Sequence, residues 1–250
     1  MRLVAAEILK LRRRRGLMTW SALLTIGTPI VAYSILVALH AASPDRHGPA
    51  GGTNNLQALL GLYSILGGLA GILIGTTAGS QDRSSGVFRD LAVTGRPRKA
   101  LFHGRAPGAL AVYLPLLAAG FGIAVAGSYA FAGELATPSG ADVGRYAAWI
   151  LATGVLDVVL GVALASVVSS RIATGVLVAW NAFVAPLLIQ IDTLGGARKA
   201  ISVAAARSFA PAGTDRMQIM MAAGTALLVL AVWIAVALRG AAWWTKRVDA

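Results

Sequence analysis

The residue best suited to chemistry is Asp157, which lies near the middle of the long apolar run 146–168. A carboxylate inside a membrane segment is costly and marks a candidate functional site by default. Thr153 and Gly161 lie one helical turn to either side, so a helix would turn Asp157 toward small residues and the interior of a bundle. Two interpretations stay open: Asp157 lines a path that attracts cationic molecules, or it is protonated or paired with a polar group such as Asn181.

Motifs for covalent or nucleotide chemistry are missing from the sequence. It has no cysteine, no phosphate-binding loop of the form GxxxxGK[ST] and no GxSxG motif. His40, His47 and His103 lie in polar stretches without metal-ligand spacing. We therefore expect no catalytic residue, no metal and no cofactor in this chain, and no hydrolysis of ATP by this chain alone. Asn181 is expected to form a hydrogen bond between helices, and a place for it beside Asp157 in a substrate path stays open.

The composition is that of a membrane protein. Of the 250 residues 57% are hydrophobic and only 13% are charged, against about 25% charged in a soluble domain. Apolar runs of membrane-spanning length recur six times. They predict an all-α fold with spans at 17–39, 56–78, 106–131, 146–168, 172–191 and 217–238. Tyr146 and Trp149, at the start of the fourth run, are expected in an aromatic belt at the membrane interface. We expect one transmembrane domain over 1–250.

The polar segments between and beside these runs have their own patterns. Residues 1–15 are amphipathic and basic, with Val4, Ile8 and Leu11 on one stripe, and are expected to lie as a helix in the lipid headgroups. Residues 192–216 are too polar for a span and predict one or two short helices at the outer surface. Six spans place both termini on one side, where 16 of the 22 Lys and Arg residues would lie. The positive-inside rule makes that side cytoplasmic.

The net charge of +12 is best explained by this orientation and by anionic lipid. The basic residues sit beside spans rather than on an aromatic-rich soluble face, so nucleic acid is not an expected partner. Membrane lipid is the expected one.

Glycines recur at every fourth residue of the second apolar run, at Gly67, Gly71, Gly75 and Gly79. On a helix they form a smooth ridge that another helix can approach closely. Packing inside the bundle is one interpretation. A contact with a second subunit, or one that moves, is the other.

The most polar long interval is the loop 80–105, which carries six basic residues. Within it, residues 87–93 predict a short helix with Val87, Phe88 and Leu91 as an apolar face, ended by Gly95 and Pro97. An apolar face of this kind is stable only when it is buried against another surface. Either the lipid headgroups or a soluble partner would supply it.

The loop also resembles the first cytoplasmic loop of permease subunits of type-2 ATP-binding-cassette (ABC) exporters. The likeness consists of an acidic residue, a glycine after three spacers, the stretch FRDLAVTG (88–95) and a basic pair at 98–99. Asp82 and Val87 stand where that family more often has Glu and Thr. The resemblance implies a coupling helix that contacts an ATPase through Asp82, Gly86, Val87, Phe88, Leu91, Gly95 and Arg98. It extends to the six-span layout, with 1–15 as an elbow helix and extracellular helices in 192–216.

What the resemblance implies for function is a transport subunit that forms a substrate pathway as a homo- or heterodimer. Two separate ATPase subunits would bind ATP and Mg, and the complex would be an efflux system of a bacterial plasma (inner) membrane. A secondary carrier or a small membrane scaffold without an ATPase is the alternative. Carriers carry several ionisable groups near the midplane, whereas Asp157 is the one ionisable residue within the predicted spans.

Overall fold

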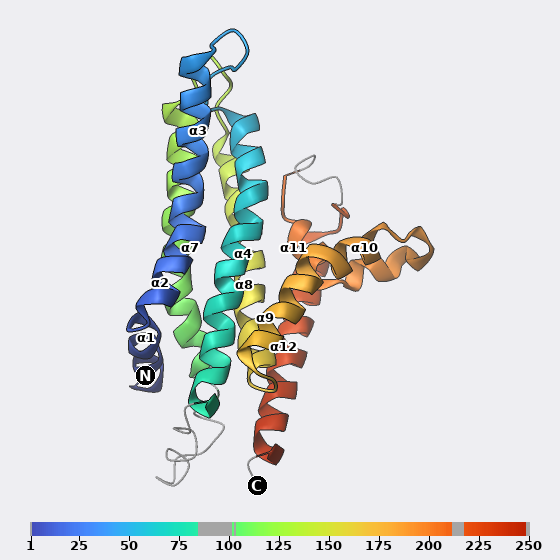
Figure 1. The fold of residues 1–250 in the computed structure, drawn as a ribbon. Helices are drawn as coiled ribbons and strands as arrows, with labels where there is room; N and C mark the ends of the chain where they lie inside the picture. The colour runs from blue at the N-terminus through green and yellow to red at the C-terminus, as the bar shows by residue number, and fades with distance from the viewer. Residues whose placement is uncertain (1, 85–101, 103, 212–217, 249–250) are drawn as a thin grey trace.

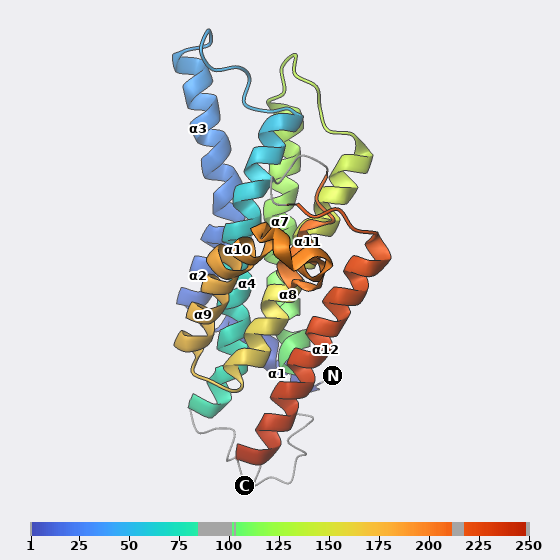
Figure 2. The ribbon, with the colours of Figure 1, turned by 90° about the vertical axis from the view of Figure 1, so that its right-hand side faces the viewer.

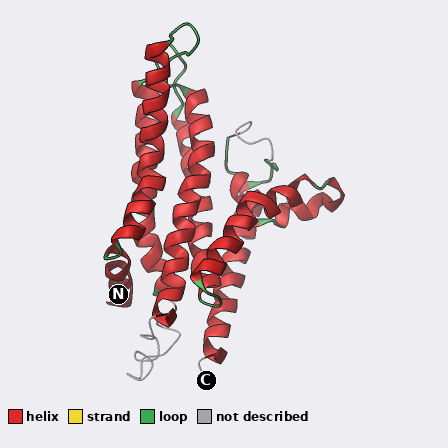
Figure 3. Cartoon of the chain, in the orientation of Figure 1, coloured by secondary structure: helices red, strands yellow, loops and turns green. Residues whose placement is uncertain are grey.

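The computed structural model describes residues 2–84, 102, 104–211 and 218–248. All regular structure in these residues is helical (Figure 3). Six helical stretches are long and apolar enough to cross a membrane: Arg15–Ala42, Thr53–Gln81, Arg105–Ala130, Gly140–Ala165, Ser170–Gln190 and Ala223–Thr245. The predicted all-α class with six membrane-spanning helices is confirmed, and the chain is a multi-pass membrane protein.

The first half of the chain forms one short helix and three membrane-spanning stretches. A short helix α1 (Arg2–Arg12) precedes the first span, which is built from α2 (Arg15–Ala22), the π-helical turn η1 (Leu23–Gly27) and α3 (Thr28–Ala42). The second and third spans are α4 (Thr53–Ser84) and α7 (Arg105–Ala130).

In the second half of the chain, the helices are shorter and more often interrupted. The fourth span, α8 (Gly140–Ala165), is followed by a fifth made of α9 (Ser170–Ala179), the π-helical turn η2 (Trp180–Val184) and α10 (Ala185–Gln190). A 3₁₀ segment η3 (Asp192–Ala200) and α11 (Ser202–Arg207) lead to the last span, α12 (Ala223–Val248).

Two helix boundaries differ from the predicted ones for local reasons. The fourth span begins at Gly140 rather than 146, because the Ser139 side chain accepts a hydrogen bond from the Asp142 amide and caps a polar first turn. The last span covers Ala223–Val248 rather than 217–238, so the helix continues through the basic and aromatic residues that follow position 238. Arg247 stacks over the Trp243 ring 3.9 Å from its centroid, a pair one turn apart that favours this extension.

Figure 1 shows both termini at one end of the molecule, together with the helix ends that flank residues 85–101. Helix α4 packs against α8 and α7 in the centre, and α12 lies on the outside against α8. The fifth span leans away from the upright helices, and α10 and α11 lie at mid-height (Figures 1 and 2).

Each π-helical turn stands just before a proline. Leu23–Gly27 precedes Pro29, and Trp180–Val184 precedes Pro186. Proline has no N–H and its ring clashes with the carbonyl one turn earlier, so a wider turn accommodates it. The bend of the fifth span follows from this local chemistry.

The glycine ridge faces the inside of the helix bundle. A Cβ at Gly79 would stand 2.5 Å from the Val162 carbonyl oxygen, and one at Gly75 would overlap the Val158 carbonyl oxygen. A Cβ at Gly71 would meet the Tyr113 ring at 3.2 Å. The ridge therefore lets α4 approach the backbone of α8 and the side chains of α7.

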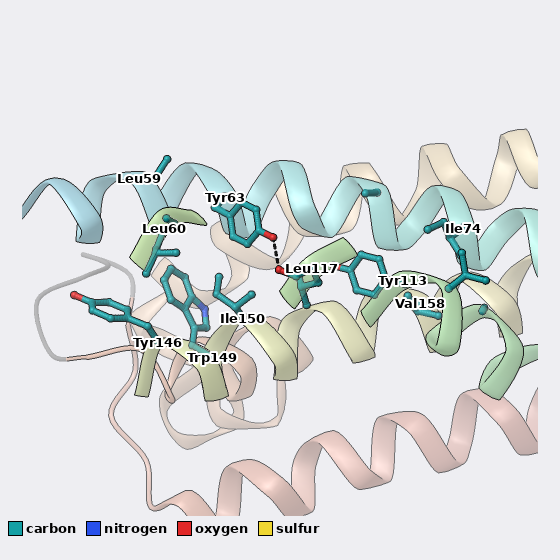
Figure 4. Packing of buried hydrophobic residues seen from close by; sticks show 14 of the residues in the cluster. Leu59, Leu60, Tyr63, Ile74, Tyr113, Leu117, Tyr146, Trp149, Ile150 and Val158 are labelled. Carbon is teal, nitrogen blue, oxygen red and sulfur yellow. Dashed lines mark hydrogen bonds between the residues drawn. The ribbon is translucent and has the colours of Figure 1, made fainter. Parts of the chain in front are cut away.

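Tyrosine hydroxyls fix the core of this bundle. Tyr63 donates to the Leu117 carbonyl at 2.7 Å (Figure 4), and Tyr113 donates to the Gly67 carbonyl at 2.9 Å. Both rings are fully buried. These bonds cross between α4 and α7 in opposite directions and hold the two helices in register.

The segment 192–216, predicted to form short helices at the outer surface, contains η3 and α11. Helix α11 lies at mid-height rather than at the end of the bundle, and Ser202–Ala206 within it are buried (Figures 1 and 2). Trp180 donates to Ser202, and Trp233 donates to the Ala200 carbonyl at 2.8 Å. Small side chains let α11 sit between α8 and α12, and the two indoles satisfy polar groups there.

Helix α1 packs against α7 at the end of the bundle where the termini lie. Leu11 is fully buried, in keeping with its place on the predicted apolar stripe. Glu7 is also buried, beside Gly108 of α7, and forms an ion pair with Lys10. The helix is thus attached to the bundle by packing as well as by its basic face.

Candidate functional site

The site is organised around Asp157, which is 2% exposed on α8. Its Oδ1 accepts a hydrogen bond of 2.7 Å from Nδ2 of Asn181. Its Oδ2 lies against Gly68 of α4, where a Cβ would stand only 2.6 Å away. The structure brings together the two residues expected in a substrate path, and Gly68 makes room for the carboxylate.

Asn181 reaches Asp157 from an irregular part of the fifth span. It is the second residue of the π-helical turn Trp180–Val184. A π turn holds one more residue than an α turn and so rotates the helix face that follows, and such turns often occur at functional sites. The turn that accommodates Pro186 also carries the amide that meets the carboxylate.

These two residues line a cavity of about 370 Å³ between α4, α8, the fifth span and α11. That volume lies within the roughly 300–1,000 Å³ of small-molecule sites. The walls are mostly apolar, with Ile65, Leu69 and Ile72 from α4 and Val203 from α11. Such a cavity suits an apolar ligand that is oriented by a few polar groups.

Three of the polar side chains that line the cavity form a stripe along α8. Trp149, Thr153 and Asp157 are spaced by four residues, so they share one helix face, and all three line the cavity. Trp149 is 3% exposed. Among the described residues neither its Nε1 nor Thr153 Oγ1 has a hydrogen-bond partner, although both atoms are buried. Buried polar atoms are normally paired, so this stripe has unused hydrogen-bonding capacity.

One cationic side chain also lines the cavity. Arg207 extends from the end of α11, and its backbone carbonyl accepts a hydrogen bond from Gln218. Within the described part of the chain it forms no ion pair with Asp157, whose hydrogen-bond partner is the neutral amide of Asn181. The carboxylate is therefore held by one neutral donor.

The side chains that line the cavity can bind a ligand through both apolar and polar contacts. The described residues contain no group of three or more His, Cys, Asp or Glu side chains that could hold a metal ion. The cavity lining offers a carboxylate, an amide, hydroxyls, an indole and a guanidinium as polar groups. A ligand in this cavity would be shielded from water, and its polar groups could form hydrogen bonds with the cavity wall.

A second cluster of polar contacts lies at the end of the bundle where both termini are found (Figure 1). Arg105, at the first turn of α7, is 3% exposed. Its guanidinium donates to the Gly79 carbonyl of α4 at 3.1 Å and to Ser166 Oγ, just after α8, at 3.4 Å. One side chain thus joins three helices next to the loop that follows α4.

The predicted coupling residues fall at the edge of the described chain or beyond it. Asp82 is in the last turn of α4, and its side chain lies outside the description. Outside the described residues also lie Gly86, Val87, Phe88, Leu91, Gly95 and Arg98.

Two residues of the site were not recognised from sequence as part of it. Trp149, with Tyr146, was expected in an interfacial belt, but both side chains are buried in the bundle (Figure 4). Gly68 stands beside the regular ridge and was overlooked. The available signal was the four-residue spacing of Trp149, Thr153 and Asp157, which places an indole and a hydroxyl on the aspartate's face.

No protein-family model matches the chain, and no curated protein matches it. The fold and the site by themselves define a multi-pass helical membrane protein with a polar stripe in a mid-bundle cavity.

Proposed function

We propose that this chain is the transmembrane subunit of an ATP-driven exporter of the ABC type. The observation that carries the proposal is the loop 80–105, with its FRDLAVTG stretch and basic pair, set between the second and third of six spans. The helix ends that flank residues 85–101 lie at the same end as both termini (Figure 1), which supports a cytoplasmic position for the loop.

In this mechanism the subunit performs no covalent chemistry. Two copies, or one copy with a homologous partner, form the pathway, and two separate ATPase subunits bind ATP and Mg. Closure of the ATPases pushes the segment 87–93, where the sequence predicts a helix, and the movement reaches the bundle through the adjoining helix ends. The junction of Arg105 with Gly79 and Ser166 supports this role, because it ties α4, α7 and α8 together there.

The test compares co-purification of an ATPase from membranes of the native host. Tagged wild-type protein is expected to retain a soluble protein with a phosphate-binding loop. Leu91→Asp places a charge on the proposed docking face and is expected to reduce that recovery at least tenfold. Leu135→Asp is the matched control, since Leu135 is exposed in the loop between α7 and α8, far from the termini. Equal recovery with Leu91→Asp and wild type would contradict the coupling assignment.

The alternative is a carrier or scaffold that works without an ATPase. The cavity at Asp157 is compatible with it, because a carrier also needs a binding site within the bundle. Recovery of the chain alone in several mild detergents would favour this alternative.

A further inference from the structure

We propose that the cavity at Asp157 binds an apolar molecule that carries one protonated amine, with the ammonium group against Asp157 and a hydrogen-bond acceptor of the same molecule on the Trp149 indole. This inference deepens the proposed function, on which it rests only for treating the bound molecule as cargo. Binding itself requires no ATPase.

Asp157 gives the site its negative charge. A carboxylate offers about four acceptor positions, and the described chain supplies Asp157 with a single donor, the Asn181 amide at 2.7 Å. A buried charge is costly unless it is paired and hydrogen-bonded. An ammonium group carries three donors and a compensating charge, so it is the ligand group that Asp157 lacks.

Two polar groups on α8 have hydrogen-bonding capacity that the described residues do not use. Trp149 Nε1 can only donate, and Thr153 Oγ1 can donate and accept. Both are buried without a partner among the described residues. Trp149 lies eight residues before Asp157. At a rise of about 1.5 Å per residue, the two positions are roughly 12 Å apart along the helix axis. A ligand that uses all three groups therefore has its amine at one end and an oxygen acceptor near the other.

The cavity walls indicate the size and polarity of the part of the ligand that lies between its polar groups. Residues from four helical elements, most of them aliphatic, form the walls between the polar groups, and the cavity holds about 370 Å³. Asp157 is the one acidic side chain among the described residues that line the cavity, so a second positive charge would have no carboxylate partner there. These features select a monocation with an apolar, aromatic-sized body rather than a polyamine or an inorganic cation.

Dansylcadaverine is a suitable probe, because it has a primary amine on an alkyl chain and an aromatic sulfonamide whose oxygens accept hydrogen bonds. Its fluorescence rises on entry into an apolar site. Titration of the purified chain in phosphatidylcholine nanodiscs is expected to show saturable binding. The N-acetylated probe keeps the aromatic body and the acceptors but has no charge, and it is expected to bind wild-type protein at least about tenfold more weakly, equivalent to about 1.4 kcal/mol.

Variants assign the contacts. Asp157→Asn preserves the shape and removes the charge, so at least about a tenfold rise in Kd is expected for the amine. Asp142→Asn is the matched control, because Asp142 is a partly exposed aspartate in the first turn of the same helix and does not line the cavity, and its Kd is expected to equal that of wild type. Trp149→Phe and Thr153→Val each remove one hydrogen-bonding atom and are expected to weaken binding about threefold to tenfold.

Equal affinity of wild type for the amine and its acetylated form would overturn the inference, and so would an equal effect of Asp157→Asn and Asp142→Asn. The comparison of the two probes uses wild-type protein, so it decides the question even if Asp157→Asn does not fold. Amine binding by a chain that recovers no ATPase would refute the exporter proposal alone. Recovery of an ATPase without discrimination between the probes would refute this inference alone.

Discussion

Gly75→Ala tests whether the glycine ridge sets the distance between α4 and α8. A Cβ at Gly75 would overlap the Val158 carbonyl oxygen and stand 3.1 Å from the carbonyl carbon and Cα of the same residue. All three atoms belong to backbone, so no side-chain rotation relieves the contact. The two helices would have to separate, and α4 is the helix that packs most extensively on α8.

The magnitude follows from two opposing effects. Alanine in place of glycine favours a helix by up to about 1 kcal/mol, whereas overpacking a well-packed site costs about 1–3 kcal/mol, with the upper end expected where backbone must move. A net loss of roughly 2 kcal/mol is expected. Gly61→Ala is the control on the same helix, because a Cβ there meets nothing within 4 Å, and it should be neutral or slightly stabilising.

The assay is unfolding of both variants by sodium dodecyl sulfate in mixed micelles, followed by circular dichroism. The expected order of unfolding free energy is Gly61→Ala equal to or above wild type, with Gly75→Ala clearly below both. Equal stability of the two variants would refute the close approach of α4 and α8 at this glycine.

Three further substitutions probe single contacts. Arg105→Met removes the guanidinium that joins three helix ends and should lower the unfolding free energy by about 1.5–3 kcal/mol, as for hydrogen bonds to charged groups; a wild-type unfolding curve would contradict this. Tyr63→Phe removes the bond to the Leu117 carbonyl, and a loss of about 0.5–1.5 kcal/mol is expected in the same assay, so an unchanged value counts against the bond. Asn181→Leu leaves Asp157 without its donor and should lower the thermal midpoint in detergent by more than Tyr63→Phe does, a ranking whose reversal would argue against the buried pair.

The spans could be predicted because length and hydropathy alone define them, and the six apolar runs correspond to six helices. The ends of the spans were harder to predict. They depend on local capping, such as that by Ser139, and on whether a polar segment continues the helix. The placement of α11 could not be predicted, because its composition allows a surface or a buried position. Its tertiary contacts with Trp180 and Trp233 select the buried one.

At the site, the aspartate could be predicted because an ionisable residue stands out in an apolar run. The pairing with Asn181 was one of several open options, and the π turn that directs it depends on how the chain adapts to Pro186 within the bundle. Trp149 was assigned to the membrane interface because tryptophans are common there. Its burial arises from the packing of α8 on α4, which no local pattern encodes.

The central claim, that this chain works as the membrane half of an ATP-driven exporter, is tested most directly by native mass spectrometry of the complex extracted from its own membrane. The account predicts an assembly of two membrane subunits, at least one of them this chain, with two copies of a soluble subunit that carries a phosphate-binding loop. A monomer or oligomer of this chain without any such subunit, under conditions that preserve other membrane complexes of the same host, would contradict it.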